Sequence, residues 1–289
     1  MRIIVFSKNR ACQLELLLRS LTEQMADSSQ LFISVLYFAD TPEFTQGYAT
    51  VQSLFPDVHF VEEEKNRSLN QQLLSLLQMK EMELLTYLVD DLVFINSFSL
   101  SDPPFQQFAR DPDIAAISLR LNPNVTLCQP QGKSYRPPPL DSNNVWRWKP
   151  KEKILNACLD KWKLLKYFRP RGDWAHPMYV DGNVWRLGEY LDYFQDLPEV
   201  RKVTKLEPAM SALPMQSPKM VCYPKPRIVN LALNRVDSVY DYPCGEEDAN
   251  DLNDRFLNGE RLSYHHLKKQ TFSSCHIIQK ARWLEPKSE

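Results

Sequence analysis

The sequence predicts an α/β protein in which a largely parallel sheet is covered by helices on both faces. Two observations carry this prediction. Short apolar runs alternate along the N-terminal part of the chain with segments whose apolar residues recur at helical spacing, which is the pattern of successive strand–helix units. The apolar runs are also nearly continuous, as in strands that are buried on both faces. With 289 residues, 43% of them hydrophobic, the chain is long enough to build a substantial core.

The expected elements follow this alternation from the start of the chain. The first apolar run, residues 2–6, is followed by leucines at helical spacing within residues 14–21, so a strand leads into a helix. Further strands are expected at residues 31–38, 58–61, 84–89 and 114–119, with helices at 44–54, 68–77 and 105–110. Ser68 is a suitable N-cap for the third of these helices.

The composition of the sequence changes between residues 122 and 150. Prolines cluster there beside Trp146 and Trp148, which predicts a long loop between two halves, residues 1–120 and 121–289, that pack as a single domain. In the second half we expect helices at residues 154–165, 185–194 and 200–213, a strand region at 220–236, an acidic helix at 246–256 and a short helix at 264–269.

Composition excludes several classes of function. The 35 basic and 36 acidic residues give a net charge of -1, without the basic excess that nucleic-acid binding requires, so we expect no nucleic-acid partner. The six cysteines occur singly, which indicates reduced thiols and no structural zinc site. The first apolar run is too short for a signal peptide or a membrane span. We therefore expect a cytoplasmic protein with no transmembrane segment.

Polar residues follow the first four apolar runs. In an open parallel sheet, ligands bind beyond the carboxyl ends of the strands, so these residues are the first candidates for a site. They are Ser7 to Arg10 after the first run, Asp40 after the second, residues 62–67 after the third, and Asp90 with Asp91 after the fourth. Because the carboxyl ends of parallel strands lie at one edge of a sheet, we expect these residues to converge.

Asp90 and Asp91, here called the acid pair, stand inside an apolar run, between Leu88-Val89 and residues 92–95. Adjacent carboxylates among buried residues are unfavourable unless a cation or hydrogen-bond donors compensate them. Mg²⁺ or Mn²⁺, bound by one or two carboxylates and completed by diphosphate oxygens, meets that requirement. The alternative at this point is a loop pair that caps a neighbouring helix.

Three stretches of the chain carry a resemblance to a known family. They are Ile4-Val5-Phe6-Ser7-Lys8-Asn9-Arg10, Asn66-Arg67-Ser68-Leu69-Asn70 and Tyr87-Leu88-Val89-Asp90-Asp91. Together they resemble GT-A nucleotide-sugar glycosyltransferases, particularly family 2-like members, well over about the first 120 residues and loosely beyond them. The resemblance implies a GT-A fold, with residues 1–120 as the nucleotide-sugar-binding half and residues 121–289 as the acceptor-binding half. The acid motif of that family is usually Asp-x-Asp, whereas here the two aspartates are adjacent, closer to a Glu-Asp-Asp variant.

The resemblance also implies roles for individual residues. It places Phe6, Ser7 and Arg10 at the base and diphosphate of the donor, Asp40 at the base, Asn66 and Arg67 beside the nucleotide, Asp90 near the ribose or a bound water, and Asp91 on the metal. Some GT-A enzymes bring a C-terminal histidine to the metal, which makes His276 a candidate second ligand. A lone arginine or asparagine at such a position is more often a surface or capping residue.

The second half is expected to supply the acceptor site and a general base. The segment from Asp181 to Arg186 resembles the glycine-containing stretch of the family near the donor sugar, and Glu207 falls near its acidic base motif. Glu207 is the first candidate for the base and Asp181 the second; an ordinary helix charge is the alternative for Glu207. Asp173 is a weaker candidate for acceptor contact. Three tryptophans can either stack on sugar rings or pack within the loops: Trp146, Trp148 and Trp174.

The resulting hypothesis is a glycosyltransferase that depends on Mn²⁺ or Mg²⁺. It would move a sugar from a nucleotide diphosphate sugar to a hydroxyl acceptor on a glycan, lipid or protein, with inversion if the base assignment holds; a retaining mechanism stays open. The alternative is a non-catalytic GT-A scaffold that binds nucleotide or glycan. With only 7 glycines, the chain has no glycine-rich phosphate loop, which argues against a nucleotidyltransferase.

Overall fold

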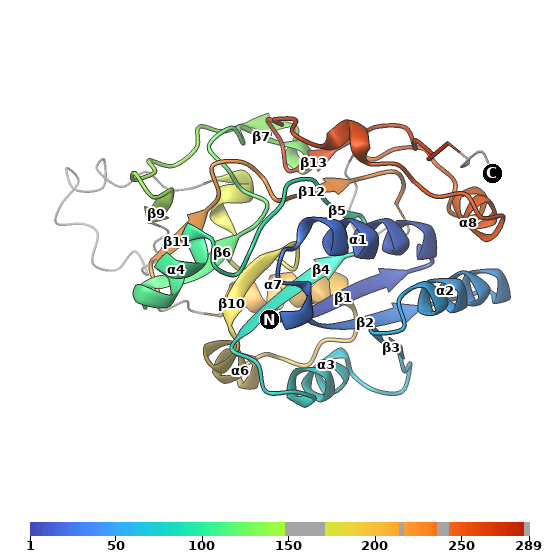
Figure 1. Ribbon diagram of the computed structural model, residues 1–289. Coiled ribbons are helices and arrows are strands. Elements are labelled where there is room, and N and C mark those ends of the chain that lie inside the picture. Colours follow the sequence, from blue (N-terminus) through green and yellow to red (C-terminus); the bar gives the residue numbers. More distant parts are fainter. Residues whose placement is uncertain (148–170, 214–216, 236–242, 286–289) are drawn as a thin grey trace.

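The computed structural model describes residues 1–147, 171–213, 217–235 and 243–285. Its centre is an eight-stranded sheet in the order β3-β2-β1-β4-β10-β6-β11-β9 (Figure 1). The strands are β1 (Arg2–Lys8), β2 (Phe32–Phe38), β3 (His59–Glu62), β4 (Leu84–Val89), β6 (Ile114–Ser118), β9 (Val145–Arg147), β10 (Asn183–Arg186) and β11 (Lys219–Cys222). The first four strands are parallel to one another, so the predicted α/β class with a largely parallel sheet is confirmed.

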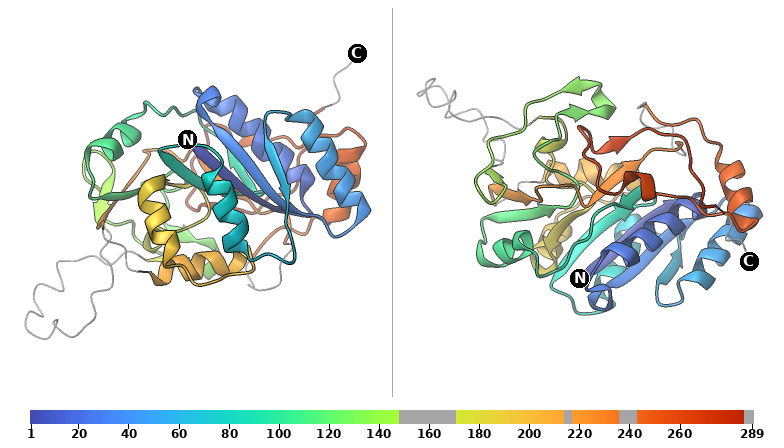
Figure 2. Two further views of the ribbon diagram at one scale, coloured as in Figure 1. Left: turned by 90° about the horizontal axis from the view of Figure 1, so that it is seen from below. Right: turned by 45° about the horizontal axis from the view of Figure 1, so that its top comes forward.

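Helices cover both faces of this sheet, as the sequence predicts. They are α1 (Ala11–Gln24), α2 (Pro42–Leu54), α3 (Leu69–Gln78), α4 (Pro103–Arg110), α6 (Leu187–Gln195), α7 (Val203–Ala212) and α8 (Ala249–Leu257). One core forms between the sheet and α1, α2, α4 and α8, and a second forms between the sheet and α3, α6 and α7. Figure 2 shows these two groups of helices on opposite sides of the sheet. The expected cap of α3 is present, because Ser68 and Gln71 form a capping box.

A small second sheet lies next to the carboxyl end of β4. Its order is β13-β12-β5, with β5 at Leu92–Phe94, β12 at Ile228–Leu231 and β13 at His276–Ile277. The acid pair forms the turn between β4 and β5, so this small sheet starts directly after it. Strand β12 pairs with β5 on one side and with β13 on the other. Two distant parts of the C-terminal half are thereby brought beside the acid pair.

The structure corrects the expected helix at residues 185–194. Its first two residues, Trp185 and Arg186, belong to β10, which is antiparallel to both of its neighbours, β4 and β6. The helix begins only at Leu187. A short apolar run gives no periodicity that separates a buried strand from a buried helix, and here the space between β4 and β6 decides the outcome.

Other elements of the second half differ in detail from the expectation. The loop expected at residues 122–150 contains the hairpin of β7 (Leu127–Cys128) and β8 (Lys133–Ser134), as well as β9. The short helix expected at residues 264–269 is a single 3₁₀ turn, His265–Leu267. The helix expected at residues 154–165 and Trp148 lie outside the described residues. The boundary between the two halves stays a prediction, although strands from both contribute to the large sheet.

Within the part of the chain that the structure describes, no helix is both long enough and apolar enough to cross a membrane.

Candidate functional site

The first loop turns sharply at Asn9, which has a left-handed backbone conformation with φ of 54°. Asparagine tolerates this conformation better than most residues. The amide of Asn9 donates to the carbonyl of Phe38, and its side-chain Oδ1 accepts from the amide of Asp40, so the loops after β1 and β2 are tied together. The turn places Arg10 at the start of α1, beside the acid pair.

Asp90 is held on all sides by this first loop. Its carboxylate accepts hydrogen bonds from the hydroxyl of Ser7 at 2.9 Å, the amide of Lys8 at 3.0 Å and the guanidinium of Arg10 at 3.0 Å. Ser7 in turn contacts the hydroxyl of Tyr48 at 2.7 Å. The backbone amide of Asp90 donates to the carbonyl of Phe6, which extends the ladder between β1 and β4. Asp90 therefore joins the end of β4 to the first loop.

Asp91 has much weaker partners than its neighbour. Its Oδ2 lies 3.7 Å from Nη1 of Arg10, and its Oδ1 accepts a long hydrogen bond of 3.3 Å from Asn230. The side chain is 13% exposed, against 5% for Asp90. Burial raises the pKa of Asp91 to about 6; Arg10 opposes this rise, while the charges of Asp90 and Asp181 add to it. Asp91 is thus the member of the acid pair whose charge is least compensated.

Asp181 reaches the same region through a glycine that no other residue can replace without strain. Gly182 has φ of +78°, and a Cβ there would lie 2.1 Å from Cδ1 of Ile228 in β12. Its amide donates to the carbonyl of Tyr87 and its carbonyl accepts from the amide of Leu119, so it joins the ends of β4 and β6. This close approach sets Asp181 beside β12.

A buried arginine, Arg120, compensates Asp181. The side chain of Arg120 is only 2% exposed, and its Nη1 lies 2.7 Å from Oδ2 of Asp181. Nη2 of Arg120 lies 3.7 Å from a second carboxylate, that of the buried Asp173. Nη1 also donates to Oδ1 of Asn230 at 3.0 Å. Burial raises the pKa of Asp181 even though Arg120 opposes the rise.

His276 contacts the same guanidinium nitrogen of Arg120 as Asp181 and Asn230. Its Nε2 is 3.4 Å from Nη1 of Arg120. Burial, together with the charge of Arg120, lowers the pKa of His276 to about 3, so its imidazole is neutral at physiological pH. A metal ion bound at Nε2 would face the guanidinium directly.

Glu207 comes from α7 and packs against the residue before Asp181. Its Oε1 accepts a hydrogen bond of 2.8 Å from the amide of Val180. Burial and the charge of Asp181 raise the pKa of Glu207 to about 8, against the opposing effects of the Val180 amide and Arg120. A carboxyl group with a pKa near the working pH is suited to general acid–base chemistry.

The structure brings together some of the candidates from the sequence and leaves others apart. Ser7, Arg10, Asp90, Asp91, Asp181, Glu207 and His276 lie around the carboxyl end of β4 in the contacts described above. Asp40 and Asn66 are exposed. Arg67 bonds the side chains of Glu64 and Ser75 and a carbonyl of α3, all near it in sequence. Phe6 is buried, with its ring 5.4 Å from that of Tyr87, and meets the site through its carbonyl.

Sequence reasoning missed two residues of this cluster. Arg120 lies just beyond the end of β6. The rule that selects residues after strand ends would therefore find it when applied to the fifth apolar run as well. Asn230 lies inside β12, within an otherwise apolar strand of the small sheet, and no local pattern marks it. Only the pairing of β12 with β5 brings it to the acid pair.

A metal ion fits this cluster only if a bound diphosphate supplies some of its oxygen ligands. Among the described residues, no group of three or more histidine, cysteine or acidic side chains is arranged to hold a metal ion. Asp91 nevertheless offers a partly exposed, under-compensated carboxylate, and one carboxylate with diphosphate oxygens is a usual set for Mg²⁺. The residues present therefore fit a metal that is shared with a bound diphosphate.

Two of the tryptophans pack against each other. The rings of Trp146 and Trp174 meet edge to face with centroids 5.0 Å apart, and both side chains are almost fully buried. The indole nitrogen of Trp174 donates to the carbonyl of Val125. The two tryptophans therefore pack inside the protein and do not form an exposed platform for a sugar ring.

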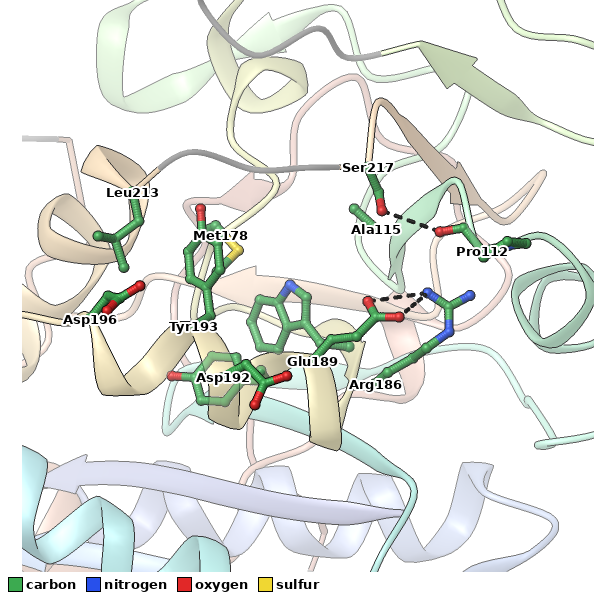
Figure 3. Close-up of a pocket in the computed structure, with 12 residues that line it drawn as sticks. Pro112, Ala115, Met178, Arg186, Glu189, Asp192, Tyr193, Asp196, Leu213 and Ser217 are labelled. Carbon is green, nitrogen blue, oxygen red and sulfur yellow. Dashed lines mark hydrogen bonds and ion pairs between the residues drawn. The ribbon is translucent and has the colours of Figure 1, made fainter.

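A pocket of about 490 Å³ opens near the amino-terminal end of β4, opposite the end that carries the acid pair (Figure 3). Two of its lining residues, Trp185 and Arg186, pair with the first residues of β4, whereas the acid pair follows the last residue of that strand. Arg186 in this pocket is paired with Glu189 at 3.3 Å. The pocket is therefore separate from the acid cluster.

Comparison with known proteins finds a relative that is similar to this chain in sequence. No protein-family model matches the chain. The chain is 25% identical, over an alignment of 316 positions, to the bifunctional glycosyltransferase pgtA of Dictyostelium discoideum. The alignment covers 96% of this chain but only 38% of that protein, so the chain spans well under half the length of its relative.

Solved structures show a more distant likeness. The mannosyltransferase PcManGT from Pyrobaculum calidifontis, in complex with GDP-Man and Mn²⁺, is 17% identical, with 77% of this chain and 54% of that chain covered and a TM-score of 0.46. TarS residues 1–349 of S. aureus, in complex with UDP-GlcNAc, is 11% identical, with 77% and 59% covered and a TM-score of 0.40. The relationship to pgtA confirms that the chain resembles a glycosyltransferase along almost all of its length.

Proposed function

We propose that the chain is a GT-A-type glycosyltransferase that uses Mn²⁺ or Mg²⁺ to move a sugar from a nucleotide diphosphate sugar to a hydroxyl acceptor. The observation that carries this proposal is the division within the acid pair: Asp90 is fully bonded by the first loop, whereas Asp91 keeps an under-compensated charge. The pair stands at the carboxyl end of a parallel strand, where α/β sheets bind ligands. Similarity to a glycosyltransferase supports the same activity.

On the donor side, the first loop is the proposed nucleotide contact. Phe6, Ser7 and Arg10 are expected near the base and diphosphate, and Asp90 near the ribose or a bound water. Asp40, Asn66 and Arg67 are further candidates, although the guanidinium of Arg67 already bonds the side chains of Glu64, in the loop before α3, and Ser75, in α3.

Asp91 is the proposed metal ligand, together with oxygens of the donor diphosphate. The bound ion would neutralise the negative charge that develops on the departing diphosphate. His276 remains a candidate second ligand. Its Nε2 faces Arg120 at 3.4 Å, however, so we assign the main role to Asp91.

Glu207 is the proposed general base. It would take the proton of the acceptor hydroxyl, while the hydroxyl oxygen bonds to the anomeric carbon and the bond from that carbon to the diphosphate breaks. A single displacement of this kind inverts the anomeric configuration. Asp181 is the second candidate, because its Oδ2 is held by the guanidinium of Arg120 at 2.7 Å and is therefore less available to an acceptor hydroxyl.

A panel of nucleotide sugars that covers the common bases tests the proposal. We expect Mn²⁺-dependent release of a nucleoside diphosphate from at least one donor, reduced about 100-fold or more in Asp91→Asn. Asp57→Asn, a change of an exposed aspartate away from the site, is the matched control. Metal-dependent nucleotide binding without turnover would favour the non-catalytic scaffold, and the absence of binding by any nucleotide would refute both functions.

A further inference from the structure

Asn230 contacts three charged side chains at once. Its Nδ2 donates to Oδ1 of Asp91 at 3.3 Å and to Oδ2 of Asp181 at 3.4 Å, while its Oδ1 accepts from Nη1 of Arg120 at 3.0 Å. Arg120 also bonds Asp181 directly at 2.7 Å. Arg120, Asp181 and Asn230 therefore form a closed ring of contacts, and Asn230 extends that ring to Asp91.

The backbone of Asn230 is held on both sides. The residue is 2% exposed and lies in β12, the central strand of the small sheet, where it pairs with Leu92 in β5 and with His276 in β13. Its amide donates to the carbonyl of Cys275, and the amide of Leu231 next to it donates to the carbonyl of Asp91. The small sheet thus sets the position of the side chain relative to the acid pair.

The chemistry of the three neighbours determines which way the amide of Asn230 points. A guanidinium only donates hydrogen bonds and an ionised carboxylate only accepts them. A flipped amide would set Nδ2 against the donor Arg120 and Oδ1 against both Asp91 and Asp181. The orientation with Oδ1 on Arg120 satisfies all three contacts, so Arg120 orients Asn230.

A neutral amide suits this position better than a charged side chain. Asp91 and Asp181 repel each other, and each carboxylate accepts a hydrogen bond from Nδ2 of Asn230. A lysine or arginine here would neutralise Asp91 and compete with a divalent ion, and an aspartate would add a third negative charge. Asn230 thus contacts both carboxylates without adding a charge of its own.

We propose that Asn230, oriented by Arg120, is a positioning residue that fixes Asp91 relative to Asp181. Through Asp91 it would hold the metal and the donor diphosphate in register with the acidic residues on the acceptor side, Asp181 and Glu207. This inference rests on the proposed function. It adds two residues to the proposed site, Asn230 in β12 and Arg120 just after β6, which act through the carboxylates rather than on the substrate.

Asn230→Leu tests the proposal because leucine has a similar volume and none of the three contacts. Loss of a residue that orients a metal ligand typically costs about 10–100-fold in metal affinity or activity. We expect the Mn²⁺ concentration for half-maximal activity to rise, and kcat to fall, each by about 10–100-fold, with the KM for the acceptor little changed. A merely structural role would lower the fraction of active protein and leave the Mn²⁺ requirement of that fraction unchanged.

Two further variants make the test secure. Asn253→Leu replaces another buried asparagine, whose amide donates to the carbonyl of Glu43 far from the site, and it should leave the Mn²⁺ requirement unchanged. Asn230→Asp keeps the shape of the side chain and the acceptor for Arg120, but it loses both N–H donors. We expect it to be impaired at least as strongly in kcat as Asn230→Leu, and it supplies the test should the leucine variant fail to fold.

The outcomes separate this inference from the proposed function. No turnover by the wild-type protein with any donor would refute the glycosyltransferase, whatever the variants do. Turnover by the wild-type protein, with an unchanged Mn²⁺ requirement and kcat in Asn230→Leu or in Asn230→Asp, would refute the role of Asn230 and leave the glycosyltransferase standing.

Discussion

Nη1 of Arg10 lies 3.0 Å from Oδ1 of Asp90 but 3.7 Å from Oδ2 of Asp91. One cation is therefore shared unequally by two adjacent carboxylates. The closer contact is completed by Ser7 and the amide of Lys8, and it joins the first loop to the end of β4. Burial raises the pKa of Asp91, and the longer contact with Arg10 opposes only part of that rise. The acid pair thus combines one well-bonded carboxylate and one that is less compensated.

Exchanging each aspartate of the pair for asparagine should have opposite effects on stability. Asp90→Asn leaves the buried guanidinium of Arg10 poorly compensated and turns an amide N–H toward other donors, so we expect it to lower the free energy of unfolding by about 3 kcal/mol. Asp91→Asn removes a charge from a largely buried position and should raise that free energy by about 3 kcal/mol near pH 7.5, because the pKa of Asp91 is raised from 3.8 to about 6. Urea unfolding of both variants checks the contrast; equal destabilisation would contradict it.

The requirement for metal should depend on pH through Asp91. The pKa of this carboxyl is about 6, and only its ionised form binds a divalent ion, so the Mn²⁺ concentration for half-maximal activity should fall as pH rises through about 6. Mn²⁺ titrations of activity at several pH values between about 5 and 7.5 measure this. An unchanged requirement across that range would exclude Asp91 as the ligand.

The rate of the chemical step should depend on pH through Glu207. With a pKa of about 8, Glu207 is largely protonated at pH 7, so kcat should rise with pH until about 8 if Glu207 is the base. Glu207→Gln should lower kcat by about 100-fold or more and remove this rise. Asp181→Asn is the comparison, since a larger loss of kcat there, with the pH profile kept in Glu207→Gln, would make Asp181 the base.

Glu207 should also make stability depend on pH. Its pKa is raised in the folded chain, so it stabilises the fold fully below the unfolded value near 4.5, and this contribution is lost as pH rises through about 8. Glu207→Gln cannot ionise, so its free energy of unfolding relative to wild type should increase from about pH 5 to about pH 8 and then level off. Denaturant unfolding at a series of pH values tests this; parallel stability curves would contradict it.

Arg120 should matter as much for stability as for function. It is the buried cation beside two carboxylates, the buried Asp173 and the partly buried Asp181. Removing one member of a buried ionic group leaves the others uncompensated, at a cost of about 3–5 kcal/mol. We therefore expect Arg120→Met to unfold at a markedly lower denaturant concentration, or to fail to accumulate as folded protein. A free energy of unfolding within about 0.5 kcal/mol of the wild-type value would mean that solvent already compensates these carboxylates.

Several features of this protein could be read from local sequence patterns. The alternation of apolar runs and helical periodicity predicted β1 to β4 and the helices between them, because each pattern depends only on residues a few positions apart. The rule that strand ends meet at one edge then selected Ser7, Arg10 and the acid pair. The expected cap at Ser68 is present for the same reason, since a capping box spans only four residues.

The tertiary structure alone decided the rest of the cluster. The insertion of β10 between β4 and β6, the close approach at Gly182 and the pairing of β12 with β5 are contacts between distant segments, which no local periodicity encodes. Those contacts bring Arg120 and Asn230 to the acid pair. The sequence by itself determined which strand end carries Asp90 and Asp91. Which of the two is bonded closely within the protein, and which is less compensated, follows from side chains that the fold assembles around them.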